Sequence, residues 1–105
     1  MVVNTGGEKV FVEEVEQALL RHPDVIDVLV VGRPSSRFGQ EVVAIVQLAP
    51  AAAVDADGLR EFAAQSVARF KAPRAFVFTD SIGRHPTGKP DYQWARATAE
   101  QAVAI

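Results

Sequence analysis

The sequence predicts a small α+β domain in which a three-stranded sheet is packed with helices. Three short apolar runs, rich in β-branched or aromatic residues, alternate with segments whose apolar residues recur at helical spacing. Turn-forming residues separate these segments, and a glycine pair near the start predicts a short hairpin or loop before the first helix. With 105 residues, 49% of them hydrophobic and 23% charged, the chain has the size and composition of a single ordered domain over 1–105.

The first half of the chain is expected to form a turn, a helix and two strands. The turn comprises residues 4–7 (NTGG), where two glycines permit backbone angles that other residues resist. A helix follows over 12–22, because its apolar residues recur every three or four positions and acidic residues crowd its first turns. Residues 25–32 (VIDVLVVG) and 41–48 (EVVAIVQL) predict two strands, joined by the eight-residue connection 33–40.

A second helix is expected before the third strand. Asp55 or Asp57 is placed to cap it, and the helical spacing of apolar residues extends it to Phe70, before Pro73 ends it. We interpret Phe70 as an anchor in the core or at a domain interface.

The last part of the chain predicts a strand, a loop and a helix. Residues 75–79 (AFVFT) form the third strand, and residues 80–88, rich in Pro, Gly and polar side chains, form the loop. The pair 90–91 (PD) is expected in the first turn of the last helix, which Trp94 would anchor to the core or to an interface.

Composition excludes several classes of function. Cysteine is absent, which removes disulfides and thiolate chemistry, and the only imidazoles are His22 and His85, so no metal site is expected. A net charge of −2 provides no basic field for nucleic acid or anionic lipid. Because no apolar run reaches a membrane span and the start lacks a secretory pattern, we expect a cytoplasmic protein without a transmembrane segment.

A loop near the end of the chain carries the strongest chemical signal. Lys89 follows Thr87 and Gly88, and prolines restrain the backbone on both sides of this tripeptide. Such a loop, presenting one ammonium, suits an anionic, phosphate-bearing partner. It is not a nucleoside-triphosphatase loop, because Pro90 stands where Ser or Thr would hold magnesium, although Gly83 matches the upstream glycine.

Five segments in the same order resemble one enzyme family. Residues 4–16 (NTGGEKVFVEEVE) resemble the segment that opens the small C-terminal domain of adenylate-forming (AMP-binding) enzymes, and residues 86–89 (PTGK) resemble their C-terminal lysine motif. The intervening segments 30–34 (VVGRP), 39–41 (GQE) and 70–73 (FKAP) match as well. The resemblance covers essentially the whole chain and is most similar to bacterial fatty acyl-CoA synthetases.

The resemblance implies an ATP-dependent ligase of two steps, in which carboxylate and ATP give acyl-AMP and pyrophosphate, and CoA then gives acyl-CoA and AMP. In this family a large N-terminal domain binds ATP, Mg²⁺ and the carboxylate, and the small domain closes over it in two orientations. Lys89 corresponds to the catalytic lysine of adenylation, supported by its loop residues Pro86, Thr87 and Gly88. ATP and CoA are then substrates, and the N-terminal domain and the acyl-adenylate are partners.

The glycine segment, residues 6–8, corresponds to a loop that acts in the second orientation, the one for thioester formation. The resemblance implies that Gly6, Gly7 and Glu8 line the passage for the pantetheine arm of CoA. Residues 90–92 (PDY) depart from the family, since many relatives place an aliphatic and then a basic residue after the lysine. The family hinge would lie upstream of Met1, and because no ATP-binding glycine-rich loop is present, residues 1–105 alone are expected to be inactive.

Two other functions stay open. The small sheet and near-neutral charge fit a stand-alone ligand-binding or regulatory module that pairs through its sheet edge. The other is a fragment of the adenylation domain of a peptide synthetase, which passes acyl groups to a carrier protein. The lack of a carrier serine motif before Ile105 counts against this alternative.

The remaining cations are interpreted mainly as structural or solvated. Arg33, Arg37 and Arg84 are expected to be solvated or interface charges, with contacts to CoA phosphates as the alternative. Arg69 and Lys71 are expected at a helix end, where the dipole favours cations. His85 is also expected at a solvated loop position. It is not expected to act as a general base, because the carboxylate that reacts in adenylation is already ionised.

Overall fold

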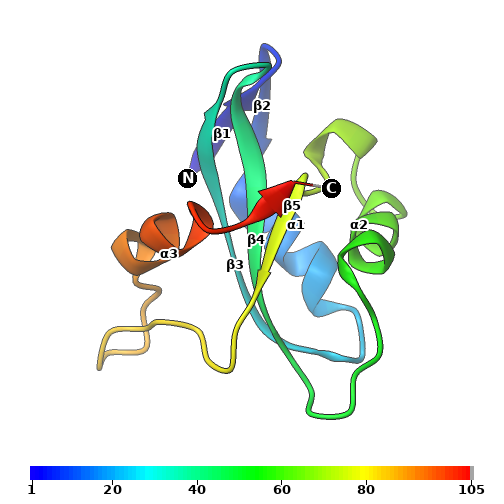
Figure 1. Ribbon diagram of the computed structural model, residues 1–105, viewed down its shortest axis with the longest axis vertical. Coiled ribbons are helices and arrows are strands. Elements are labelled where there is room, and N and C mark those ends of the chain that lie inside the picture. Colours follow the sequence, from blue (N-terminus) through cyan, green and yellow to red (C-terminus); the bar gives the residue numbers. More distant parts are fainter. Residues whose placement is uncertain (105) are drawn as a thin grey trace.

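The computed structural model describes residues 1–104, which form one twisted sheet with helices on both faces (Figure 1). In chain order the elements are β1 (Val2–Thr5), β2 (Glu8–Phe11), α1 (Val12–Leu20), β3 (Val25–Ser35), β4 (Gly39–Leu48), α2 (Ala56–Ala64), the 3-10 helix η1 (Arg69–Lys71), β5 (Ala75–Phe78), α3 (Tyr92–Ala99) and β6 (Val103–Ala104). Within these residues no helix has the length and apolarity needed to cross a membrane.

The sheet has six strands rather than the three expected. Its order is β2-β1-β4-β5-β6, with β3 paired to β4; β4 and β5 run parallel and the other pairs are antiparallel. The predicted strands correspond to β3, β4 and β5, so the α+β class is confirmed. The count is wrong because the glycine segment forms a hairpin that joins the sheet, with only four residues in each strand, and because the two-residue strand β6 pairs with β5. Such short strands show little alternation in sequence.

The β3–β4 hairpin is longer than predicted. Its ladder continues to the pair Ser35 and Gly39, so the expected connection 33–40 shrinks to three residues. The Ser35 hydroxyl accepts hydrogen bonds from the backbone N–H groups of Arg37 (3.2 Å) and Phe38 (3.1 Å), which closes the turn. Gly39 then takes a φ of 81°, which suits glycine.

The core has two layers because side chains of β3 and β4 alternate between the faces of the sheet. Val28 and Val30 pack with α1 and α2 on one face, whereas Leu29 and Val31 pack with α3 on the other (Figure 1). All four are at most 2% exposed. The sheet is therefore covered on both faces, as in other layered α and β domains.

Helix boundaries differ from the predictions in the middle of the chain. The first helix ends at Leu20 instead of His22. The second begins after Asp55, whose carboxylate accepts a hydrogen bond from the Gly58 N–H (2.8 Å), so Asp55 is the cap. This helix stops at Ala64, well before Phe70.

Two aromatic anchors have different outcomes. Phe70 lies in η1 and is 41% exposed, so it is not a core anchor, and its alternative role at a domain interface stays a prediction. The chain leaves helical angles at Ala68, with ψ near 144°, which breaks the expected helical face. Trp94 packs with the α3 layer of the core as predicted. Pro90 precedes α3 instead of opening it, because Asp91 is the N-cap.

Candidate functional site

Residues 84–90, called the lysine loop, form a tight hairpin that presents Lys89. Arg84 and Pro90 pair as a β-bridge, the His85 N–H donates to the Lys89 carbonyl (2.9 Å), and the Gly88 N–H donates to the His85 carbonyl (2.8 Å). Pro86 and Thr87 occupy the centre of this turn, and Gly88 follows with a φ of 88°. A proline at the second position and a left-handed glycine after it are typical of a type I turn with a bulge.

Gly83 fixes the base of the lysine loop against α3. Its carbonyl accepts a hydrogen bond from the Asp91 N–H (3.1 Å), and the Asp91 carboxylate caps α3 at the Trp94 N–H (3.0 Å). A Cβ added to Gly83 would lie 2.5 Å from Cδ2 of Trp94, a distance that real Cβ contacts do not show. The sequence indicated Gly83 only as a partial match to a phosphate-binding loop, so this packing role was not predicted.

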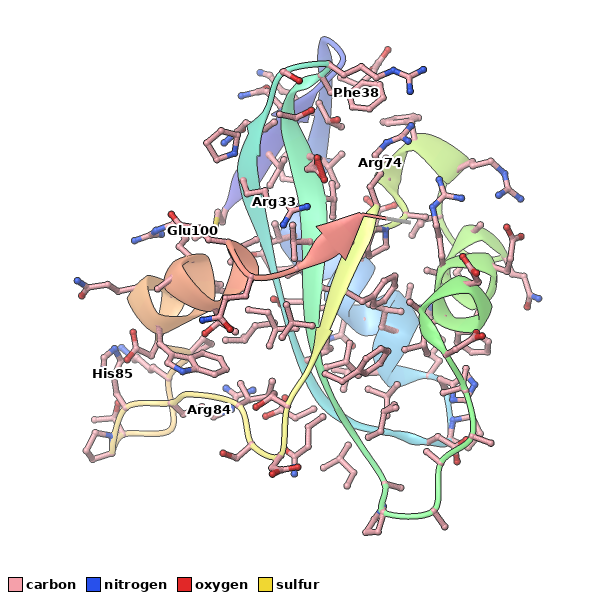
Figure 2. All side chains as sticks on the ribbon, viewed as in Figure 1. Arg33, Phe38, Arg74, Arg84, His85 and Glu100 are labelled. Atoms are coloured by element: carbon pink, nitrogen blue, oxygen red, sulfur yellow. The ribbon has the colours of Figure 1, made fainter. Side chains whose placement is uncertain are left out.

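The Lys89 side chain is exposed. Among the residues that the structure describes, no carboxylate lies within 4.0 Å of its ammonium. His85 is also exposed and contributes backbone hydrogen bonds to the turn (Figure 2).

Residues 2–11, called the glycine hairpin, form the second candidate site. Thr5 and Glu8 pair across a two-residue turn in which Gly6 and Gly7 have φ values of 57° and 84°. Positive φ at both central positions defines a type I′ turn, which matches the right-handed twist of a hairpin. The Gly6 N–H donates to the Phe38 carbonyl (2.9 Å), which holds the turn beside the β3–β4 turn; the Glu8 side chain is exposed.

A groove with a volume of about 690 Å³ lies next to the glycine hairpin. Nine residues line it, including Arg33, Arg37, Phe38, Arg74 and Glu100 (Figure 2). We call it the arginine groove. The Phe38 ring has the Arg74 guanidinium 4.1 Å from its centroid and the Arg37 guanidinium 5.0 Å away. Sequence reasoning did not single out Phe38 or Arg74; the signal was an aromatic residue beside an arginine in an otherwise polar connection.

The lysine loop and the glycine hairpin lie at opposite ends of the molecule. In Figure 2, His85 of the lysine loop is at the lower left, whereas Phe38, which contacts Gly6, is at the top. The structure therefore does not bring Lys89 together with Gly6, Gly7 and Glu8.

Among the described residues, four of the other basic side chains form ion pairs: Arg33, Arg69, Lys71 and Arg84. Arg33 donates to the carbonyls of Ala99 (2.9 Å) and Ala102 (2.6 Å) at the end of α3 and forms an ion pair with Glu41 (3.3 Å). Its side chain is only 16% exposed, so the interpretation of Arg33 as solvated is wrong. It caps the C-terminal end of α3, where the Ala99 carbonyl also accepts a hydrogen bond from the Ala102 N–H (3.1 Å).

Arg69 and Lys71 lie in η1 instead of at the end of α2, so their predicted position is wrong. Arg69 pairs with Glu61 (3.0 Å) and Lys71 with Glu14 (3.1 Å). Arg37 is exposed, as predicted.

Arg84 is bound to Asp27 of β3 in addition to the lysine loop. Its Nε and Nη2 atoms donate to the two carboxylate oxygens of Asp27 at 3.0 and 2.7 Å. These bonds raise the pKa of the Arg84 guanidinium. Of the two expected roles for Arg84, a solvated or an interface charge, free solvation is wrong, because Arg84 is an ion-pair partner of Asp27.

A half-buried acid lies near this pair. Glu16 accepts a hydrogen bond from the Val30 N–H of β3 (2.8 Å), and burial raises the pKa of its carboxyl. Burial, together with the charge of Glu16, also raises the pKa of the Tyr92 phenol. Within the described part of the chain no three His, Asp or Glu side chains gather in a geometry that would hold a metal ion.

Comparison with known proteins places these features in a family. A family model described as the AMP-binding enzyme C-terminal domain matches residues 14–89. The medium-chain acyl-CoA ligase Mig of Mycobacterium avium is 59% identical over 101 residues, which are 96% of this chain and 18% of that protein. A medium/long-chain-fatty-acid–CoA/3-oxocholest-4-en-26-oate–CoA ligase of Mycobacterium tuberculosis is 49% identical over 97% of this chain and 19% of its own length.

A solved structure of related sequence has the same fold. The amide bond synthetase McbA from Marinactinospora thermotolerans matches with a TM-score of 0.87 and 33% identity, over 91% of this chain and 19% of that chain. The chain thus spans about a fifth of the length of the relatives it matches.

Proposed function

Because the chain belongs to the AMP-binding enzyme C-terminal domain family, we propose that it works as the mobile C-terminal domain of an ATP-dependent acyl-CoA synthetase. The enzyme would join a carboxylate to AMP and then transfer the acyl group to CoA. One observation carries the proposal: the lysine loop and the glycine hairpin lie at opposite ends of one compact domain. A single active site can therefore meet either of them, but not both, in one orientation.

In the adenylation orientation, Lys89 would enter the active site of the N-terminal domain. Negative charge increases on the α-phosphate as the carboxylate attacks and pyrophosphate leaves. A preorganised ammonium stabilises that charge, and a compact point charge from lysine fits between two anions better than the broad guanidinium of arginine. The tight turn of Pro86, Thr87 and Gly88 limits the motion of the backbone that carries Lys89.

The described residues do not fit a magnesium site, since no cluster of carboxylates is present. Bound Mg²⁺ would neutralise charge on the triphosphate, and we assign it, like ATP and the carboxylate, to the N-terminal domain. No step of the proposal goes through the metal.

In the thioester orientation, the glycine hairpin would line the approach of CoA. Gly6 and Gly7 lack side chains, so a slender pantetheine arm can pass close to their backbone. The adjacent arginine groove provides cations and an aromatic ring, with Arg74 placed over Phe38. Arginine binds phosphate through paired N–H donors, which suits the phosphorylated nucleotide end of CoA.

CoA is the acceptor that we favour over a carrier protein or an amine. The two acyl-CoA ligases are 59% and 49% identical to this chain, whereas the amide bond synthetase is 33% identical. Assays with CoA, a carrier protein and a simple amine distinguish these acceptors, and a preference for either of the other two would contradict this part of the proposal.

The test uses a full-length ligase in which this chain replaces the matching residues of the M. avium relative. Lys89→Ala is expected to slow carboxylate-dependent exchange of pyrophosphate into ATP by about 100-fold or more. Thioester formation from supplied acyl-adenylate should survive, and Lys89→Arg should restore exchange only in part. Equal loss in both half-reactions would rule out the role of Lys89.

We also propose that residues 1–105 alone form no acyl-AMP. Formation of acyl-AMP by the purified chain would contradict this. A stable dimer that binds a small effector, detected by native mass spectrometry and calorimetry, would instead support the stand-alone module.

A further inference from the structure

We propose that Arg84 and Asp27 are positioning residues that hold the lysine loop, and thereby Lys89, in place for adenylation. This inference rests on the proposed function, because it assumes that Lys89 is the adenylation lysine. Neither residue needs to touch the substrates, since both would act through the backbone of the loop.

Arg84 links the lysine loop to β3. Two of its nitrogens bind the Asp27 carboxylate in a bidentate pair at 3.0 and 2.7 Å. Its Nη1 atom donates to the carbonyl of Gly88 at 3.2 Å, and this carbonyl belongs to the peptide bond that joins Gly88 to Lys89. Bidentate pairs of arginine and carboxylate restrict orientation as well as distance. The guanidinium therefore ties the peptide directly before Lys89 to the sheet.

Asp27 is oriented by an irregularity of β3. The register with β4 shifts between Val25 and Asp27, so Ile26 is an extra residue. Val25 packs with the α1 layer, whereas Leu29 packs with the α3 layer, although strict alternation would place both on one face. The bulge thus reverses the alternation, so Asp27 lies on the same face of the strand as Leu29. This is the face on which Asp27 binds Arg84 of the lysine loop.

The Asp27 carboxylate is itself held in place. Its Oδ1 atom accepts a hydrogen bond from the Val28 N–H at 2.9 Å, in addition to the bond from Arg84. Its side chain is 25% exposed and that of Arg84 is 35% exposed, so the pair is partly shielded from solvent. Because its acceptor is fixed on the sheet, the Arg84 side chain is held in one orientation. We call this contact between Arg84 and Asp27 the brace.

The lysine loop has few other supports. Its residues from Arg84 to Lys89 are all exposed, and the loop is otherwise attached at its base, where Gly83 packs on Trp94. A partly exposed ion pair adds little to global stability. Loss of the brace should therefore change the geometry of Lys89 much more than it changes folding.

The experiment uses the full-length chimeric ligase described above. Arg84→Gln is expected to slow the pyrophosphate exchange reaction by about 10-fold to 100-fold, the effect of misplacing a catalytic group by about 1 Å. Thioester formation from supplied acyl-adenylate should stay within about twofold, because Lys89 does not take part in it. Asp27→Asn breaks the charged pair from the other side and should slow exchange in the same way.

The matched control is Arg69→Gln, which breaks another bidentate pair, the one between Arg69 and Glu61 (3.0 and 3.2 Å), away from the lysine loop. It should leave both half-reactions unchanged. Thermal unfolding of every variant verifies that the domain is folded.

A double mutant separates positioning from direct contact. If Arg84 acts only through Lys89, then Arg84→Gln should add less than about twofold to the loss already caused by Lys89→Ala. Multiplied losses, unchanged exchange in Arg84→Gln, or equal loss in both half-reactions would overturn the inference. If Lys89→Ala itself leaves exchange intact, the proposed function fails; if only Arg84→Gln does so, the brace alone fails.

Discussion

Substitution of Gly83 by alanine tests how tightly the base of the lysine loop is packed. The added Cβ would lie 2.5, 2.7 and 2.8 Å from three ring atoms of Trp94, so the loop or the indole must shift. Extra atoms in a packed site cost about 1–3 kcal/mol. For a domain of this size each kcal/mol lowers the unfolding midpoint by roughly 4–8 °C. We therefore expect a fall of at least about 4 °C.

Trp94 is the only tryptophan in the chain, so its fluorescence reports on the same contact during unfolding. The matched test is a double-mutant cycle with Trp94→Leu, in which the smaller side chain should make room and reduce the cost of Gly83→Ala by about 1 kcal/mol. A Gly83→Ala midpoint equal to that of the parent, or equal costs in both backgrounds, would refute the packing argument.

Three other substitutions test the remaining features. Burial raises the pKa of Glu16, so its charged form opposes folding above the ordinary value of 4.5; Glu16→Gln should therefore gain stability relative to the parent as pH rises from about 4.5 to 7.5 in thermal unfolding. Arg33→Ala removes the side-chain donor to two carbonyls at the end of α3 and the ion-pair partner of Glu41, which should cost about 1–3 kcal/mol in chemical denaturation, whereas Arg69→Ala should leave the midpoint unchanged. Gly7→Ala should destabilise the glycine hairpin by about 1–2 kcal/mol, because φ is 84°, and Gly7→Asn should cost less; unfolding midpoints check the order.

The parts of the fold that sequence predicted are those whose signal is local. The strand runs 25–32 and 41–48 are continuous and β-branched, so they were recognised, and Asp55 was identified as a cap candidate from its position before an apolar repeat. The extension of the β3–β4 ladder past Arg33 was not visible, because a proline and polar residues predict a loop there. In the structure Pro34 lies on an edge strand, where a missing N–H is tolerated.

The supports of the candidate site were missed because they are distant in sequence. Asp27 and Arg84 are 57 positions apart, and no periodic pattern links them. One clue was present: Asp27 interrupts the apolar run 25–32, and a charged residue inside a buried strand needs a partner. Arg33 had no comparable signal, since two of its partners are backbone carbonyls at the end of α3 and the third, Glu41, lies on the neighbouring strand β4.

The two candidate sites are joined by one rigid element. Asp27, near the start of β3, anchors the lysine loop, and the turn that follows Ser35, at the end of the same strand, anchors the glycine hairpin through Phe38. Ser35 lies eight positions after Asp27, which corresponds to about 27 Å of extended strand. Since β3 is paired along its length with β4, the spacing of the two sites cannot change through loop motion alone. Under the proposed function, exchange of one site for the other at a shared active centre would therefore require rotation of the whole domain, and stiffening a single loop should not prevent it.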